Sequence, residues 1–136
     1  MGALPPRYSF FLNTYRAERF TRCPRCHATT RLRKVPLVIH VESFGLVLLR
    51  KTCRLCPACE MLIAHEFELN AELQEVAARS DADGEYVVLG TIGSGTWRAG
   101  IRERISIEQV KHDMADFKAY MKVDVAPRQW APARRA

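Results

Sequence analysis

The residues best suited to chemistry are the cysteines of two short repeats, Cys23-Pro24-Arg25-Cys26 and Cys56-Pro57-Ala58-Cys59. Two cysteines separated by two residues form a tight turn that presents both sulfurs to one point, and the 29 residues between the repeats are enough for a β-hairpin that brings the pairs together. Four thiolates at this spacing are the ligand set of a structural, tetrahedral zinc site. We therefore expect one Zn²⁺ to be bound by Cys23, Cys26, Cys56 and Cys59.

A fifth cysteine, Cys53, overlaps the second repeat, because it stands three residues before Cys56. We assign Cys56 and Cys59 to the metal, since only this pair repeats the Cys-Pro-x-Cys phrase. Cys53 is then expected to be a small buried thiol near the metal, with a substitute ligand or a redox-sensitive neighbour as the alternatives.

Two other chemistries use the same cysteines. An iron–sulfur cluster would take Cys53, Cys56 and Cys59 with one of the first pair, but the fourth cysteine of a ferredoxin-like run is replaced by Ile63. A thioredoxin-type dithiol needs one cysteine pair at the start of a helix, whereas these pairs flank a predicted hairpin. Both alternatives are less favoured than zinc.

Composition and length predict one globular domain. The chain has 136 residues, of which 48% are hydrophobic, which is enough for a core. No apolar stretch approaches the roughly 20 residues that span a bilayer, and the first residues do not have the pattern of a secretory signal. An odd number of cysteines grouped for metal binding indicates reduced thiols, so we expect a cytoplasmic protein that does not contact membranes.

The charges are distributed unevenly along the chain, whose net charge is +6. Residues 1–54 hold eleven Lys or Arg against two acidic residues, whereas residues 55–96 hold one against eight. A basic region attracts anionic partners, and Tyr15 and Phe20 lie within it, where nucleobases would stack. The candidate nucleic-acid-binding residues are Arg22, Arg25, Arg31, Arg33, Lys34, Arg50, Lys51 and Arg54. Arg22, Arg25 and Arg54 are also placed to offset the negative charge of a zinc–thiolate site.

Strands are predicted in five places. Apolar residues alternate over residues 35–42 and indicate a half-buried antiparallel strand, in which Pro36 marks an edge position or a bulge. Residues 43–45 turn the chain, and residues 46–52 return as the partner strand. Further strands are expected over residues 61–65 and 86–92, and residues 8–12 are either a strand or a strap across the core.

Two helices are predicted, one over residues 66–79 and one that begins at Ser106 and extends to Lys122. The first has an apolar stripe at helical spacing, and the second begins with a capping box formed by Ser106 and Gln109. The glycine-rich residues 90–96 lack the lysine of a phosphate-binding loop and are expected to form a flexible turn. Residues 1–7 are expected to be a flexible lead-in, residues 8–123 a single domain, and residues 124–136 a flexible basic tail.

No arrangement of residues indicates catalysis. The glutamates of residues 66–79 are typical of a solvated helix face, and no serine or cysteine lies in a nucleophile motif. The four histidines are expected to be core or surface residues rather than ligands: His27, His40, His65 and His112. We therefore predict that the protein is not an enzyme.

Several segments of the chain resemble a group of small uncharacterised bacterial zinc-ribbon proteins. The resemblance lies in Phe11-Leu12-Asn13, Arg19-Phe20-Thr21-Arg22-Cys23-Pro24-Arg25-Cys26, Leu37-Val38-Ile39-His40-Val41, Lys51-Thr52-Cys53-Arg54-Leu55-Cys56-Pro57-Ala58-Cys59, Leu62-Ile63-Ala64-His65, Val88-Leu89-Gly90-Thr91 and Trp97-Arg98. It implies a ribbon fold and bound zinc but no activity. The cysteine repeats alone are similar to ribbons of transcription and translation factors, which implies a link to nucleic-acid machinery.

Together these patterns predict an α+β fold: a zinc-ribbon antiparallel β-sheet with additional strands and two packed helices. The predicted function is that of a structural-zinc-binding, non-enzymatic module that contacts RNA or DNA through its basic region. The alternative is a zinc-stabilised protein–protein interaction module, and an iron–sulfur or thiol-redox protein is the third choice.

Overall fold

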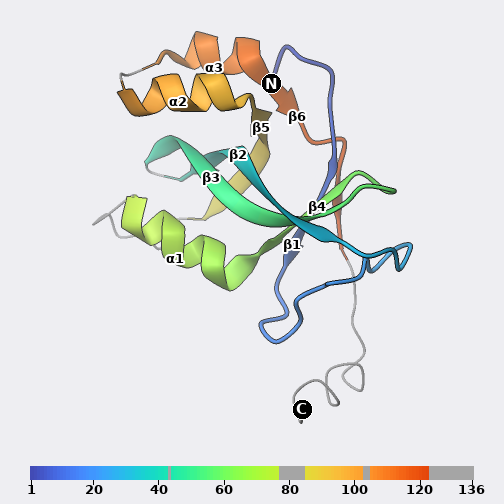
Figure 1. Cartoon of the computed structure of the whole chain (residues 1–136). Coiled ribbons are helices and arrows are strands. Elements are labelled where there is room, and N and C mark those ends of the chain that lie inside the picture. The colour runs from blue at the N-terminus through green and yellow to red at the C-terminus, as the bar shows by residue number, and fades with distance from the viewer. Residues whose placement is uncertain (43, 77–84, 103–104, 123–136) are drawn as a thin grey trace.

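Within the residues that the structure describes, a seven-stranded sheet with three helices packed on it forms the body of the molecule (Figure 1). This arrangement comes from a computed structural model that describes residues 1–42, 44–76, 85–102 and 105–122. The strands are β1 (Ser9–Asn13), β2 (Arg31–Val41), β3 (Gly45–Cys56), β4 (Met61–His65), β5 (Tyr86–Ile92), β6 (Met114–Asp116) and β7 (Ala119–Met121). The helices are α1 (Glu66–Val76), α2 (Ser94–Arg102) and α3 (Ile107–Asp113). The α+β expectation is confirmed.

The strand order is β6-β5-β2-β3-β4-β1-β7, and the sheet is mixed. Strand β1 is parallel to both β4 and β7, whereas the other neighbours are antiparallel. The antiparallel sheet predicted around the cysteine repeats is present as β2, β3 and β4, and both parallel pairs involve β1. Strand β1 is parallel to β4 because the hairpin between them lets the chain re-enter beside β1 in the same direction.

The long hairpin of β2 and β3 is the centre of the sheet and confirms the predicted pair of strands. Its register runs from Arg31 opposite Leu55 to Val41 opposite Gly45, and Gly45 has a φ of 111° that suits glycine. Strand β5 pairs with β2 only from Leu37 onwards. Pro36 therefore lies in the part of β2 that is an edge, where its missing N–H breaks no pairing with β5.

Side chains alternate between the two faces of this hairpin, and each face has a different cover. The α1 face carries the odd-numbered residues of β2 and β3 and packs beneath α1 through Leu69 and Leu73. The cysteine face carries the even-numbered residues. At one end of it α2 and α3 cover a cluster that includes Val38, Val110 and Met114, and at the other end lie the cysteine repeats with Phe11, Phe20, Met61 and Ile63.

The two edges of the sheet approach each other, so that the sheet is curled (Figure 1). The Tyr120 hydroxyl of β7 donates a hydrogen bond to the Val88 carbonyl of β5 at 2.7 Å. The Phe117 ring between β6 and β7 stacks on that of Phe10, with centroids 4.7 Å apart. Because of this curl, the core of the α1 face is enclosed by strands as well as by a helix.

The C-terminal half of the chain departs from the predicted helices. Residues 90–96, expected to form a flexible turn, instead complete β5 and begin helix α2. Thr96 of this helix donates to Asp113 of α3 at 2.6 Å. Ser106 caps α3 by accepting a hydrogen bond from the Gln109 N–H at 3.1 Å, as predicted. However, α3 ends at Asp113 instead of continuing to residue 122, because the following residues pair as β6 and β7.

Glycine at position 90 makes the pairing of β6 possible. A Cβ atom there would lie 2.2 Å from the Ala115 carbonyl oxygen, so no other residue fits without a shift of the backbone. The apolar spacing of residues 110–121 is compatible with a helix. It gives no indication that Gly90 leaves room beside β5 for another strand. The sequence pattern therefore predicted a helix where the strands form.

Residues 1–7, expected as a flexible lead-in, contact α3 and β6 in the structure. The N-terminal ammonium lies 2.6 Å from a carboxylate oxygen of Asp116, and the Ala3 N–H donates to the Lys111 carbonyl. The predicted tail of residues 124–136 and the last turn of the helix predicted over residues 66–79 lie outside the described residues. No helix among the described residues is long and apolar enough to cross a membrane.

Candidate metal centre

Both cysteine repeats form tight turns at the same end of the sheet. The first cysteine turn (23–26) precedes β2 and is closed by an isolated bridge between Arg22 and Thr29. The second cysteine turn (56–59) joins β3 to β4, whose pairing puts Cys56 opposite Met61. The β2–β3 hairpin connects the two turns and returns the chain to its starting end.

The residue that follows each cysteine pair has a left-handed backbone. His27 has a φ of 65° and Glu60 a φ of 52°, a region that favours glycine. Within the first turn the His27 N–H donates to the Cys23 carbonyl at 2.8 Å. Each chain reversal is therefore completed by a residue in a strained conformation immediately after the second cysteine.

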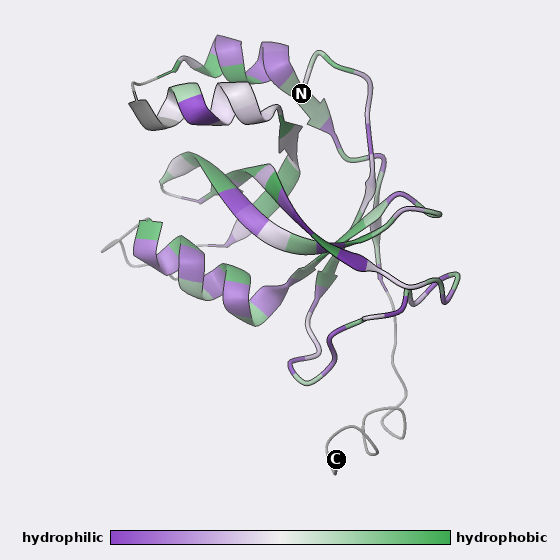
Figure 2. Cartoon of the chain, viewed as in Figure 1, coloured by the Kyte–Doolittle hydropathy of each residue, from purple (hydrophilic) through white to green (hydrophobic). Residues whose placement is uncertain are grey.

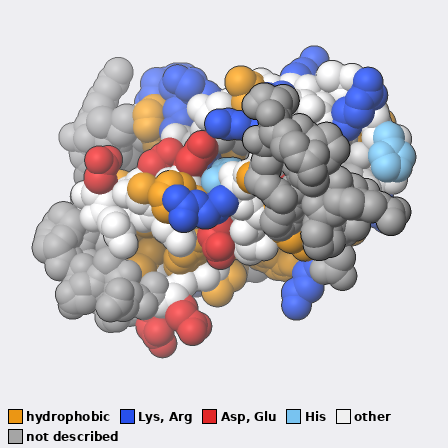
Figure 3. Space-filling view, turned by 90° about the horizontal axis from the view of Figure 1, so that it is seen from below, with side chains coloured by type: hydrophobic (Ala, Val, Ile, Leu, Met, Phe, Trp, Pro, Cys, Tyr) orange, Lys and Arg blue, Asp and Glu red, His pale blue; other side chains and the backbone are white. Residues whose placement is uncertain are grey.

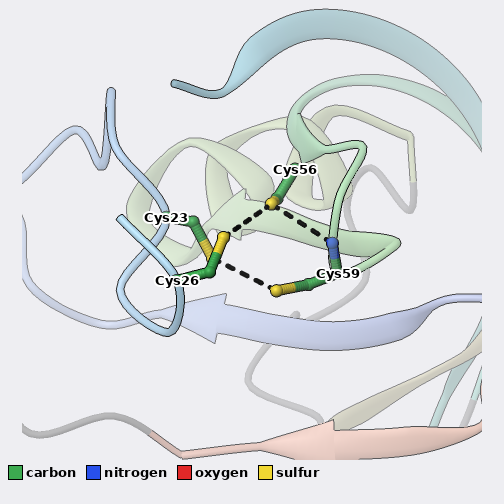
Figure 4. Close-up of side chains that lie close together, drawn as sticks. All are labelled: Cys23, Cys26, Cys56 and Cys59. Carbon is green, nitrogen blue, oxygen red and sulfur yellow. Dashed lines mark hydrogen bonds between the residues drawn. The ribbon is translucent and has the colours of Figure 1, made fainter. Parts of the chain in front are cut away.

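The four sulfurs converge on one point between the turns (Figure 4). All four Sγ atoms lie within 4.8 Å of one another. The Sγ atoms of Cys23 and Cys59 are 3.9 Å apart, and those of Cys26 and Cys56 are 3.5 Å apart. A tetrahedral ion with metal–sulfur bonds of about 2.3 Å separates its sulfurs by about 3.8 Å, so the arrangement fits a single metal ion.

Two backbone N–H groups point at the sulfurs. The Arg25 N–H donates to the Cys23 Sγ at 3.3 Å, and the Cys59 N–H donates to the Cys56 Sγ at 3.4 Å. Such donors stabilise thiolates and hold ligands in place. Sequence reasoning did not name them, although a tight turn at each Cys-Pro-x-Cys phrase is the pattern that produces them.

Burial of the cluster is graded across the four cysteines. Cys23 and Cys56 are completely buried, Cys59 is partly buried and Cys26 is exposed. The buried pair packs against the aromatic and aliphatic side chains of Phe11, Phe20, Met61 and Ile63. An ion bound by all four thiolates would have a filled tetrahedral shell, which is the arrangement of structural rather than catalytic zinc sites.

The thiols influence one another's ionisation. The Ala28 backbone and the Cys56 thiol, as hydrogen-bond donors to its sulfur, lower the pKa of Cys26 to about 7. The hydrogen bond to Cys26 together with burial raises the pKa of Cys59 to about 12, and burial raises the pKa of Cys56. Four adjacent sulfurs cannot all carry negative charge unless a cation lies among them, and a divalent metal bound between them would supply that charge.

Cys53 lies on the α1 face and so is directed away from the other four cysteines. It is 2% exposed and packs with the residues beneath α1, and burial raises the pKa of its thiol to about 12. The odd spacing between Cys53 and Cys56 along β3 produces this separation. The expectation of a small buried thiol is confirmed, and the cluster ligand set that included Cys53 is wrong.

Most of the predicted basic residues lie on the surface around this site. Arg22, Arg25, Arg31, Arg33, Lys34 and Arg50 are exposed, and Arg54 is partly buried. The Arg22 guanidinium donates to the His27 carbonyl at 3.2 Å and so braces the first cysteine turn.

Two of the predicted contact residues are unsuited to that role. Lys51 is 2% exposed, and its ammonium lies 3.3 Å from Glu68 and 3.5 Å from Glu72 on α1. Phe20 is 5% exposed and packs against Tyr15 and Phe11, so it has no ring face free for stacking. Both side chains belong to the interior because strand alternation and the cysteine cluster direct them there.

None of the histidines joins the sulfur cluster. His65 is partly buried and its Nε2 atom lies 3.0 Å from the Arg16 carbonyl, whereas His27, His40 and His112 are exposed. Among the described residues, the group of His, Cys, Asp and Glu side chains placed to hold a metal is that of Cys23, Cys26, Cys56 and Cys59.

No family model, curated protein or solved structure matches the chain. The likeness to bacterial zinc-ribbon proteins therefore remains an interpretation of the sequence.

Proposed function

We propose that the protein is a non-enzymatic zinc-binding module that contacts nucleic acid through the basic surface beside its metal centre. The observation that carries the proposal is the convergence of four cysteine sulfurs from two turns on one point. Zinc suits this ligand set because it accepts four thiolates in a tetrahedron and has no redox chemistry. The order of cysteine turn, hairpin, cysteine turn and strand supports the ribbon interpretation.

A structural metal would contribute most at this end of the sheet. The apolar cluster there contains six buried residues, and two of them are ligands. Structural zinc contributes apparent binding free energies of about 10–16 kcal/mol in small zinc peptides at pH 7. In this proposal the ion replaces the apolar burial that the end of the sheet lacks.

The basic surface supports the nucleic-acid part of the proposal. Residues 1–54 hold nine more basic than acidic residues. Among the exposed ones, Arg22 and Arg25 lie at the first cysteine turn, and Lys34 and Arg50 lie on the hairpin that joins the two turns. Phosphate groups are the anions that such a surface would bind, with an affinity that falls steeply as salt increases.

The alternative of a protein-interaction module is favoured by a separate feature. A groove of about 550 Å³ lies between the β2–β3 turn and the helices α2 and α3. Phe44 and Ile107 line it and are 51% and 54% exposed. Exposed apolar grooves of this kind are typical of interaction sites.

Metal analysis of the purified protein tests the zinc proposal. We expect about one Zn²⁺ per chain, with Cys56→Ser reducing the ratio well below one. The matched control is Cys53→Ala, which removes a thiol three residues away on the other face and should keep full zinc content. Iron in the wild-type protein, or equal loss of metal in both variants, contradicts the assignment.

A further inference from the structure

We infer that a single strand of nucleic acid binds across one strip of the cysteine face, between the metal centre and helix α2. This basic strip consists of Leu32, Lys34, Arg50, Thr52 and Arg54. The inference rests on the proposed function and deepens it, because it assigns both the surface and the form of the nucleic acid.

The register of the β2–β3 hairpin places these residues together. Leu32 is opposite Arg54, Lys34 is opposite Thr52, and Pro36 is opposite Arg50. The even-numbered positions 50, 52 and 54 of β3 are exposed or partly exposed, whereas positions 51, 53 and 55 are buried. The strip is therefore a continuous patch on one face of the hairpin. Figure 2 shows that the ribbons of β2 and β3 carry hydrophilic bands between apolar stretches.

The positive charges of the strip are not neutralised within the described part of the chain. Residues 31–36 and 50–55 contain no Asp or Glu, and the described ion pairs of the protein include none with Lys34, Arg50 or Arg54. In contrast, Lys51 on the other face is paired with two carboxylates. An anionic ligand would supply the missing charge on the cysteine face.

Structures at both ends of the strip define a path. At one end α2 and α3 (Figure 1) cover the apolar cluster of Val38 and Met114. At the other end lies the first cysteine turn, which contains Arg25 and directly follows Arg22. A phosphate chain lying across the strip would meet strand cations first and then the arginines of the first cysteine turn.

Apolar groups beside the cations favour a single strand over a duplex. Leu32 is 63% exposed and lies opposite Arg54, at the end of the strip nearest the cysteine turns. Trp97 of α2 is partly exposed, and the Arg50 guanidinium lies over its ring at 5.4 Å from the centroid. Unpaired bases have free apolar faces that stack on such groups, whereas the bases of a duplex are already stacked on one another.

The α1 face of the same hairpin provides an internal comparison. Arg31 and Arg33 stand on β2 beside Leu32 and Lys34 but are directed to the α1 face. The view of the molecule from below shows both acidic and basic side chains on its surface (Figure 3). Arg31 and Arg33 therefore match the strip in charge and strand but differ in face.

The test compares two double variants with equal changes of charge. Lys34→Glu with Arg54→Glu alters the strip, and Arg31→Glu with Arg33→Glu alters the α1 face. Binding of a labelled 12-nucleotide single strand and of a 12-base-pair duplex is measured by fluorescence anisotropy over a range of salt concentrations. Zinc content and melting temperature are measured for each variant so that only folded, metal-loaded proteins are compared.

We expect the strip variant to bind the single strand at least about tenfold more weakly, with a log–log salt slope shallower by about 1.4, which corresponds to two lost phosphate contacts. The α1-face variant should stay within about threefold of the wild type, because only the general field changes. Trp97→Ala should weaken single-strand binding about tenfold without changing the salt slope, as expected for lost stacking.

The outcomes separate this inference from the proposed function. If the wild-type protein binds neither nucleic acid at low salt, the nucleic-acid function itself is wrong. If it binds but both double variants lose affinity equally, only the assignment of the face is wrong. If it binds the duplex more tightly than the single strand, the assignment of a single strand is wrong.

Discussion

The apolar cluster beneath helix α1 and the cluster around the four cysteines share strands β1, β3 and β4, but they differ greatly in the number of buried residues. The first contains fifteen buried residues among those described, and the second contains six. In β4 the division is visible within four residues, because Leu62 and Ala64 join the first cluster while Met61 and Ile63 join the second.

This difference indicates two ways of stabilising one sheet. The α1 side has enough buried apolar surface to order its strands through the hydrophobic effect. The cysteine end has little apolar burial and ends in turns with strained residues, so under the proposed function it depends on metal coordination by the four cysteines. The comparison predicts that the two ends respond separately to different changes.

Metal removal should have the largest effect, and it should be confined to the cysteine end. When a strong chelator is added, the thiols lose the cation that balances their charge, and the turns lose most of the roughly 10–16 kcal/mol that structural zinc supplies. Hydrogen exchange followed by mass spectrometry should show loss of amide protection in residues 20–30 and 56–61. Protection in residues 37–41 should persist. Uniform loss of protection across the sheet would show that the two ends are not independent.

A cavity on the α1 side should produce the opposite pattern. Leu37 is completely buried beneath α1, and Leu37→Ala should destabilise the fold by about 2–5 kcal/mol while leaving the zinc content unchanged. Denaturant unfolding and metal analysis measure the two quantities. Leu32→Ala is the control, because Leu32 is exposed and its loss should change stability by less than about 0.5 kcal/mol. Loss of zinc from the Leu37 variant would contradict the separation.

The same comparison explains which features could be predicted from the sequence. Pairs of cysteines at short spacing act locally, so the convergence of the four cysteines and the hairpin between them were predicted correctly. The sequence also indicates that Cys59 rather than Cys53 accompanies Cys56, since alternation along β3 places Cys53 on the other face.

Features that depend on distant parts of the chain were not predictable in this way. Strands β6 and β7 form because β5 and β1 offer free edges, and Gly90 leaves room for the backbone of β6. Helix α2 begins directly after Gly93, where a run of glycines is typical of a turn. The burial of Lys51 depends on two glutamates of α1, which no property of the hairpin itself reveals.

The buried ammonium of Lys51 on the α1 face should give an effect on stability of intermediate size. Replacing both partners, Glu68→Gln with Glu72→Gln, leaves this charge at 2% exposure without a carboxylate. We expect a loss of about 1–2 kcal/mol, less than for a fully buried pair, because both glutamates are themselves partly exposed to water. Chemical denaturation measures this loss.

The matched control replaces Lys51 by an uncharged residue, so that no buried charge is left without a carboxylate partner. Lys51→Met keeps the aliphatic length of the side chain, and we expect a change in stability close to zero. A large loss in the methionine variant would mean that the ion pair itself, rather than the cost of an unpaired charge, stabilises the packing of α1 on the sheet.

The smallest expected effect is at the strained residue after the first cysteine turn. Because His27 has a φ of 65° and is exposed, His27→Gly relieves backbone strain without removing packing and keeps the hydrogen bonds of its peptide groups. We expect a gain of about 0.5–1 kcal/mol in the stability of the zinc-loaded protein, since the relief is partly offset by the greater freedom of glycine when unfolded. Thermal unfolding at saturating zinc measures it.

The control is the same substitution in an ordinary strand. His40→Gly lies in β2 between Leu46 and Val87, where a side chain suits the extended backbone, and it should cost about 0.5–1 kcal/mol. Opposite signs at the two histidines would show that the cysteine turn, unlike the strand, holds its residues against their conformational preference. A loss of stability in both variants would mean that the His27 side chain contributes to the turn, and the strain at the cysteine end would then be smaller than its backbone angle indicates.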